Sequence, residues 1–172
     1  MKRVELLAVG QMTSTKEVDQ NLATCGELAS SAQDRGAKLL CLPECFAFMG
    51  HGDVDTRAVM EPLEGPLFAR YREIARAHKI WVSFGGFPER VDADHNHNAH
   101  VIVDDSGAIR AVYRKIHLFD VTLPNGSVYK ESAVTSAGKD VVVTDSPVGA
   151  LGLSVCYDLR FPELYRALAM KD

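Results

Sequence analysis

The sequence lacks three features that would assign it to well-defined classes: a long apolar run, a basic cluster and a closely spaced cysteine pair. No apolar stretch approaches the about 20 residues that cross a membrane, and the start Met1–Glu5 has a glutamate where a signal peptide would be apolar. The net charge is −4, and Lys and Arg never stand in runs longer than two. We therefore expect neither a membrane nor a nucleic acid as a partner.

Four cysteines stand at positions 25, 41, 45 and 156, and no two have the C-x-x-C spacing of zinc ribbons or thioredoxin-like proteins. Four cysteines could form two disulfides in a secreted chain, but a reduced, cytoplasmic protein is the simpler interpretation. His95, His97 and His100 could together bind zinc or nickel. Their polar surroundings favour a solvated loop instead, so we expect no metal site.

The composition, with 47% hydrophobic and 24% charged residues, is typical of a globular protein with a core. Strand-like and helix-like segments alternate along the chain, which indicates an α/β architecture. Apolar runs predict strands over Val4–Val9, 38–42, Ile80–Phe87, His100–Asp104, Ala108–Arg114, Asp140–Asp145 and Ala150–Val155. The first of these strands is expected to be buried.

Three helices are predicted from their start signals and apolar spacing. Ser14 and Glu17 fit a capping box ahead of the first helix, and Gly36 is expected to end it. Gly65-Pro66 opens the second helix. Phe161-Pro162-Glu163 opens the last one, which is expected to continue to the end of the chain.

Two other segments are predicted to be irregular. Val91–Asn98 has the composition of a polar loop. The segment 116–139 is rich in Gly, Pro and Ser and is too long for a simple connector, so we expect it to carry function.

Three chemically complementary residues stand at the ends of predicted strands: Glu44, Lys115 and Cys156. Functional groups often gather at strand ends, because the strands hold them rigidly and the following loops leave room for a ligand. A thiol attacks a carbonyl as the thiolate, so it needs a base or a nearby cation. Glu44 could accept the proton of Cys156, and Lys115 could lower the thiol pKa and stabilise an oxyanion.

Each of these residues also has an ordinary structural interpretation. Cysteine at the end of an apolar strand is commonly a small buried hydrophobe. Glu44 could be a loop carboxylate, and Lys115 a solvated charge. Spacing along the chain does not decide between these interpretations.

The motifs around the three residues resemble the catalytic blocks of the nitrilase, or carbon–nitrogen hydrolase, superfamily. The blocks are Leu42-Pro43-Glu44, 113–120 (YRKIHLFD) and 156–163 (CYDLRFPE), and they stand in the family's order. The resemblance implies an α/β fold, the nitrilase-type four-layer α-β-β-α sandwich, with a single domain over residues 1–172.

The resemblance also implies roles for individual residues. Glu44 is expected to be the general base, Lys115 the catalytic lysine and Cys156 the nucleophile. Glu131 stands where relatives carry a second active-site glutamate, which would position the lysine or the substrate; its alternative is an ordinary loop carboxylate. The backbone N–H of Tyr157 is expected to join Lys115 in binding the oxyanion.

The implied reaction is hydrolysis of a small-molecule amide through a thioester, releasing ammonia without a metal or an organic cofactor. The residues after the nucleophile, Tyr157-Asp158 and 160–163 (RFPE), are most similar to the Nit branch of the superfamily. That branch implies deaminated glutathione as the first choice of substrate. The alternatives are ω-amides such as α-ketoglutaramate and, third, N-carbamoyl amino acids. The family also implies a homodimer or a higher homo-oligomer.

The sequence departs from the family in length, because members continue well past the position of Asp172. We therefore expect the domain to be incomplete at its C-terminus. An alternative from another class follows, namely an inactive fragment or binding scaffold that retains the motifs by descent.

Overall fold

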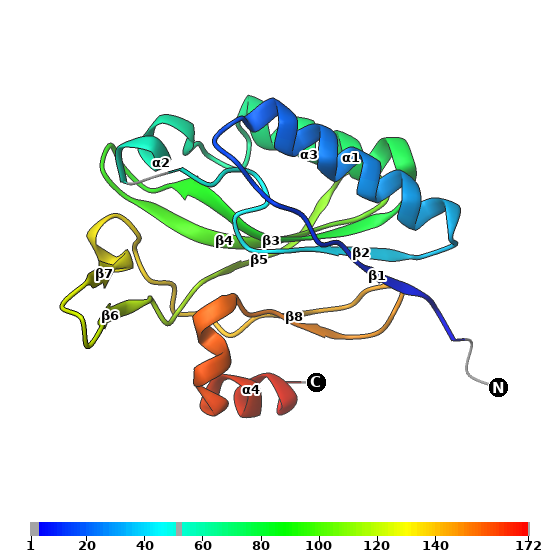
Figure 1. Ribbon diagram of the computed structural model, residues 1–172. Coiled ribbons are helices and arrows are strands. Elements are labelled where there is room, and N and C mark those ends of the chain that lie inside the picture. The colour runs from blue at the N-terminus through cyan, green and yellow to red at the C-terminus, as the bar shows by residue number, and fades with distance from the viewer. Residues whose placement is uncertain (1–3, 51–52, 172) are drawn as a thin grey trace.

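The computed structural model describes residues 4–50 and 53–171, and its centre is a five-stranded sheet (Figure 1). The strands are β1 (Leu7–Val9), β2 (Leu39–Leu42), β3 (Trp81–Arg90), β4 (Asn96–Val103) and β5 (Ile109–Arg114), and they are neighbours in that order. β1, β2 and β3 run parallel, whereas β4 and β5 are antiparallel to their neighbours. The predicted α/β architecture is confirmed.

Two helices cover one face of this sheet, α1 (Val18–Asp34) and α3 (Pro66–His78) (Figure 1). α1 turns Cys25, Ala29 and Ala32 into the core, and α3 turns in Phe68, Tyr71 and Ala75. Gly65 caps α3 ahead of Pro66, as predicted, and Gly36 follows α1 with a φ of +79°. A short helix between them, α2 (Asp53–Val59), was not predicted.

The opposite face of the sheet is covered by a second apolar cluster. It joins Ile102 of β4 and Tyr113 of β5 to Leu153, Leu164 and Leu168 of the C-terminal segment. Because side chains alternate along a strand, Ile102 enters this cluster while its neighbours enter the cluster beneath the helices. The C-terminal elements are β8 (Val143–Thr144), β9 (Leu151–Gly152) and α4 (Pro162–Ala169), and Figure 1 shows β8 and α4 beneath the sheet.

The long segment after β5 contains its own hairpin, formed by β6 (Asp120–Thr122) and β7 (Val128–Lys130). A 3₁₀ turn over Glu131–Ala133 follows β7, and a second one, Cys156–Arg160, follows β9. These turns carry three of the predicted site residues, Glu131, Cys156 and Tyr157. None of the described helices has the length and apolarity needed to cross a membrane.

Two predictions for the ends of elements are wrong because tertiary hydrogen bonds override local signals. α1 begins at Val18 without a capping box at Ser14; instead, the buried Asn21 amide accepts from Thr15 N at 2.9 Å and donates to the carbonyls of Thr15 and Ala47. The predicted loop Val91–Asn98 is also too long. β4 begins at Asn96, because the ladder with β3 extends to the pair of Arg90 and Asn96.

Two further predictions are wrong at the ends of the chain. β1 is not buried: it lies at the edge of the sheet, and Val9 is 78% exposed. α4 ends at Ala169, and Asp172 lies outside the described residues. The predicted strands 140–145 and 150–155 are each reduced to a two-residue ladder.

Candidate active site

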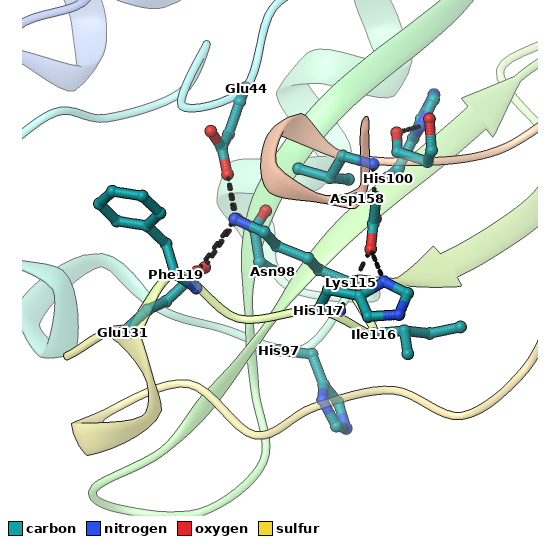
Figure 2. Close-up of polar contacts among 12 residues, drawn as sticks. Glu44, His97, Asn98, His100, Lys115, Ile116, His117, Phe119, Glu131 and Asp158 are labelled. Carbon is teal, nitrogen blue, oxygen red and sulfur yellow. Dashed lines mark hydrogen bonds and ion pairs between the residues drawn. The ribbon is translucent and has the colours of Figure 1, made fainter. Parts of the chain in front are cut away.

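The structure brings the ends of several elements together around one lysine (Figure 2). Glu44 follows β2, Lys115 follows β5, and Glu131 follows β7. Lys115 Nζ donates to Glu44 Oε1 at 3.0 Å and to the two carboxylate oxygens of Glu131 at 3.1 and 3.0 Å. Residues 71 and 16 positions away in sequence therefore meet, as the strand-end prediction requires.

We call Glu44, Lys115 and Glu131 the triad, and the lysine at its centre is 2% exposed. A buried ammonium is strongly disfavoured unless opposite charges and hydrogen bonds compensate it. Burial alone would lower the pKa of Lys115, but Glu44 and Glu131 outweigh it and raise the pKa above its ordinary value. Lys115 is thus a fixed positive charge that two carboxylates hold in place.

Asn98 of β4 is a member of the site that the sequence did not reveal. Its Nδ2 donates to Glu44 Oε1 at 2.7 Å and to Glu131 Oε1 at 3.4 Å, so it links the two carboxylates. The alternating pattern of β4 could have shown it, because Asn98 is two residues from the predicted start of that strand. Assignment of this stretch to a loop concealed it.

A glycine pair in β3 leaves room for this arrangement. The register between β3 and β4 shifts between Phe84 and Phe87, across Gly85-Gly86. A Cβ atom on Gly86 would lie 2.5 Å from Asn98 Oδ1 and 3.1 Å from Glu44 Cγ. Any side chain at this position would displace Asn98 or Glu44.

Glu131 is held from a second direction by the backbone that follows Lys115. The amide of Phe119 donates to Glu131 Oε2 at 2.6 Å. Glu131 thereby connects the segment after Lys115 to the end of the β6–β7 hairpin.

Cys156 begins the 3₁₀ turn after β9 and is exposed to solvent. Its φ is +44°, a region that costs a residue other than glycine about 1–3 kcal/mol and is found mostly at functional sites. This backbone turns the thiol out of the strand direction and into the cavity that Glu44 and Lys115 also line.

The electrostatic surroundings of Cys156 raise the pKa of its thiol. Burial raises its pKa, and the hydrogen bond and charge of Glu44 raise it further. Lys115 lowers the pKa, as the sequence suggested, but by less than Glu44 raises it. A thiol with a raised pKa needs a base in order to attack a carbonyl, and Glu44 is the carboxylate that is hydrogen-bonded to it.

The cavity that contains these groups has a volume of about 550 Å³, which suits a small molecule. Its polar lining includes Glu44, Lys115, Glu131, Cys156 and Asn98. Its apolar lining consists of Phe48, Met49, Pro88, Phe119, Tyr129 and Val134. An amide could place its carbonyl at the polar end while the rest of the molecule contacts the apolar wall.

The histidine group does not form a metal site. His95 Nδ1 lies 3.1 Å from Asp92, His97 Nδ1 lies 2.7 Å from Ser136 O, and His100 is bonded to Ser83 and to Ser154 O. Among the described residues, no three His, Cys, Asp or Glu side chains are placed to hold one ion. The three histidines are explained by separate structural contacts.

Comparisons with known proteins show what this chain is similar to. The sequence profile of the carbon-nitrogen hydrolase family matches residues 6–172. A deaminated glutathione amidase of Dictyostelium discoideum is 44% identical over 180 residues, which cover 100% of this chain and 62% of that protein.

Two solved structures share the fold. The Caenorhabditis elegans NitFhit protein has a TM-score of 0.84 at 37% identity, over 94% of this chain and 40% of that one. A mutant of the Nesterenkonia sp. AN1 amidase, from the nitrilase superfamily, has a TM-score of 0.80 at 28% identity, over 95% of this chain and 61% of that one. Acrylamide had added to its active-site cysteine. These likenesses confirm the nitrilase-type α/β fold, and the chain spans 40–62% of the length of the three proteins.

Proposed function

The chain belongs to the carbon-nitrogen hydrolase family, and on that premise we propose that it hydrolyses a small amide through a thioester on Cys156. One observation supports this most directly: Glu44, Lys115 and Cys156 line the same cavity, with Lys115 held by two carboxylates. A base, an oxyanion-binding cation and a nucleophile are the groups that acyl transfer through a thiol needs.

In the first half-reaction, the Cys156 sulfur attacks the amide carbon while Glu44 takes the thiol proton. The carbonyl oxygen becomes an oxyanion, which the Lys115 ammonium and the Tyr157 N–H stabilise. The carbon–nitrogen bond then breaks, and the proton on Glu44 passes to the departing nitrogen. The products of this half are a thioester and a free amine or ammonia.

In the second half-reaction, Glu44 removes a proton from water, and the resulting hydroxide attacks the thioester carbon. The same donors stabilise the second oxyanion. The carbon–sulfur bond breaks, the sulfur regains its proton, and the carboxylate product leaves. The cycle uses one base twice and consumes only water.

Glu131 and Asn98 serve this cycle by holding the other groups. Glu131 binds Lys115 with two hydrogen bonds, which fixes the position of the ammonium. Asn98 donates to Glu44 at 2.7 Å, which orients the base. We propose these as positioning roles.

Deaminated glutathione is the substrate that we propose first, because the D. discoideum relative is named as its amidase. In this compound the amide nitrogen belongs to cysteinylglycine, so the leaving group is an amine, whereas α-ketoglutaramate releases ammonia. Both compounds would leave the same acyl group on Cys156, which is the C5 acyl group of α-ketoglutarate. They differ only in the leaving group, which must lie toward the mouth of the cavity. N-carbamoyl amino acids are the third candidates.

The test is the release of cysteinylglycine from deaminated glutathione and of ammonia from α-ketoglutaramate, measured on wild type and on Cys156→Ala. The proposal predicts turnover by wild type and none by the variant. Equal turnover by both would refute the role of Cys156. No turnover by wild type on either amide, nor on an N-carbamoyl amino acid, would favour an inactive scaffold.

We also propose that the protein acts as a homo-oligomer in a reducing compartment such as the cytoplasm. A reducing compartment keeps the thiol nucleophile active, and Cys25, Cys41, Cys45 and Cys156 are all free. The β6–β7 hairpin exposes Val128 by 66% and Tyr129 by 53%, and these side chains are available for contact with a second copy. Light scattering that shows a monomer at micromolar concentration would contradict the oligomer.

A further inference from the structure

A fully buried carboxylate lies two residues after the nucleophile and takes no part in the chemistry described above. Asp158 is 0% exposed and belongs to the 3₁₀ turn that Cys156 begins. A buried charge is costly unless its oxygens are fully bonded, so its partners show what it holds in place.

The first partner lies on the other side of the nucleophile. Val155 N donates to Asp158 Oδ2 at 2.8 Å, and Asp158 N donates back to Val155 O at 3.0 Å. These two bonds close a ring around Cys156. The ring holds the backbone of Cys156 at its positive φ of +44°, a conformation that is strained for any residue other than glycine.

The other partners, Tyr113 and His117, lie on either side of the catalytic lysine in the sequence. Tyr113 Oη donates to Asp158 Oδ2 at 2.7 Å, and His117 donates to Oδ1 from its backbone N at 3.1 Å and from Nδ1 at 2.7 Å (Figure 2 shows His117 with Asp158). Tyr113 and His117 lie two residues before and two residues after Lys115. Asp158 therefore connects the turn that carries the nucleophile to the segment that carries the lysine.

His117 is itself fixed in orientation. Its ring stacks on Phe161 with centroids 3.7 Å apart and planes 7° apart. A carboxylate bonded to Nδ1 of a histidine is also how catalytic bases are oriented in cysteine and serine hydrolases. However, among the described residues that line the cavity, Glu44 is present and His117 is not, which assigns His117 to holding Asp158.

We propose that Asp158, held by Tyr113 and His117, is a positioning residue that fixes the Cys156 thiol against Glu44 and at a set distance from Lys115. This inference rests on the proposed function, because the positioned thiol is the nucleophile of that reaction. Misplacement of a reacting group by about 1 Å can reduce a rate by about 100-fold, so the loss of one bond in this network should be measurable.

The structure supplies a matched pair of variants for the test. Tyr113→Phe removes the hydroxyl that donates to Asp158. Tyr71→Phe removes a hydroxyl that is equally buried but has no hydrogen-bond partner among the described residues. A second pair is His117→Leu, which removes the side-chain donor, and His117→Asn, whose amide can donate in place of Nδ1.

Two quantities are measured on all four variants and on wild type: kcat and KM for amide hydrolysis, and the pH profile of Cys156 alkylation by iodoacetamide, followed by mass spectrometry of the Cys156 peptide. We expect Tyr113→Phe and His117→Leu to lower kcat by about tenfold or more with KM little changed, because a displaced thiol binds substrate but attacks it poorly. We expect Tyr71→Phe to match wild type and His117→Asn to recover most of kcat.

The alkylation profile reports the thiol position without any turnover. The ionisable groups that face the thiol are Glu44, Glu131, Lys115 and Cys45, and contact with Glu44 raises the pKa of Cys156. A thiol that moves away from Glu44 should ionise more easily, so the midpoint for Tyr113→Phe should lie at lower pH than the midpoint for Tyr71→Phe.

Three outcomes decide the matter. If Tyr113→Phe equals Tyr71→Phe in both measurements, the positioning role is wrong. If His117→Asn is as impaired as His117→Leu, His117 transfers protons, and the inference is also wrong. If wild type hydrolyses none of the amides, the proposed function fails, and the alkylation profiles by themselves establish or reject the positioning of the thiol.

Discussion

Substitution of Glu44 by glutamine should have opposite effects on the two reactions of Cys156. Glutamine keeps the side-chain oxygen that accepts from Lys115 at 3.0 Å and from Asn98 at 2.7 Å, but it cannot take up a proton. General-base catalysis contributes about 10²–10⁴-fold, so kcat should fall by that factor, or about 3–5 kcal/mol in activation free energy.

The same substitution should make the thiol more reactive toward a small alkylating agent. Two carboxylates and one ammonium give the triad a net charge of −1, and the substitution makes it neutral. Burial raises the pKa of Cys156 first and Glu44 raises it further, so removal of the Glu44 charge lowers the pKa. At a fixed pH of about 8, a larger fraction of Cys156 is then thiolate, and iodoacetamide reacts faster.

Both rates should be measured on the same preparations, with the Cys156 peptide identified by mass spectrometry. Glu73→Gln is the matched control, because Glu73 lies on α3 with its side chain 52% exposed and should change neither rate. Slower alkylation of the Glu44→Gln variant would refute the reasoning, since it would mean that Glu44 already holds the resting thiol as a thiolate.

Three further predictions concern the surroundings of the triad. Gly86→Ala would place a methyl group 2.5 Å from Asn98 Oδ1, and we expect steady-state kinetics to show a lower kcat while circular dichroism shows the fold retained. Gly138→Ala would place a methyl group against the Arg114 carbonyl oxygen, and we expect a loss of more than about 1 kcal/mol of stability in urea unfolding, which an unchanged midpoint would contradict. The carboxylates outweigh burial and raise the pKa of Lys115. The ion pairs therefore stabilise the protein fully at any pH below the ordinary lysine pKa, and this stabilisation is lost only as pH rises through the raised pKa. The difference in unfolding free energy between wild type and Lys115→Met should stay constant from about pH 7 to about pH 9.

The sequence predicted the parts of the fold that depend on local patterns. Apolar runs located β2, β3 and β5, and Gly65-Pro66 located the start of α3. The residues directly after two of those strands, Glu44 and Lys115, did meet in space. Strand ends were informative because the sheet places them at a common edge, which is a property of the fold class rather than of any single residue.

The sequence could not predict features that depend on contacts between distant segments. The start of α1 is set by Asn21, whose amide reaches Ala47 26 residues away. The hydrogen bond from Tyr113 to Asp158 joins residues 45 positions apart, and no local sequence pattern predicts it. Asn98 was missed for a related reason, because its strand is extended by pairing with β3 rather than by its own composition.

The thiol pKa shows a third limit, which concerns the balance of charges. From sequence, the nearby lysine was expected to lower the pKa of Cys156. The structure shows that burial and two nearby carboxylates, Glu44 and Glu131, also act on the thiol. Together they raise the pKa of Cys156. The sign of the pKa shift depends on distances and exposure, which the sequence does not contain. Because the pKa is raised, the attack that we propose for Cys156 needs a base, and Glu44 is the residue that we propose for this role.

The central claim is that Cys156 carries the acyl group of an amide substrate, and its most direct test is mass spectrometry of the chain quenched in acid during turnover. Deaminated glutathione and α-ketoglutaramate should give the same mass increase on the Cys156 peptide, which is that of one C5 acyl group of α-ketoglutarate. The Cys156→Ala variant should show no adduct and no hydrolysis. Hydrolysis that continues in Cys156→Ala, or turnover by wild type with the acyl group on another residue, would contradict the account.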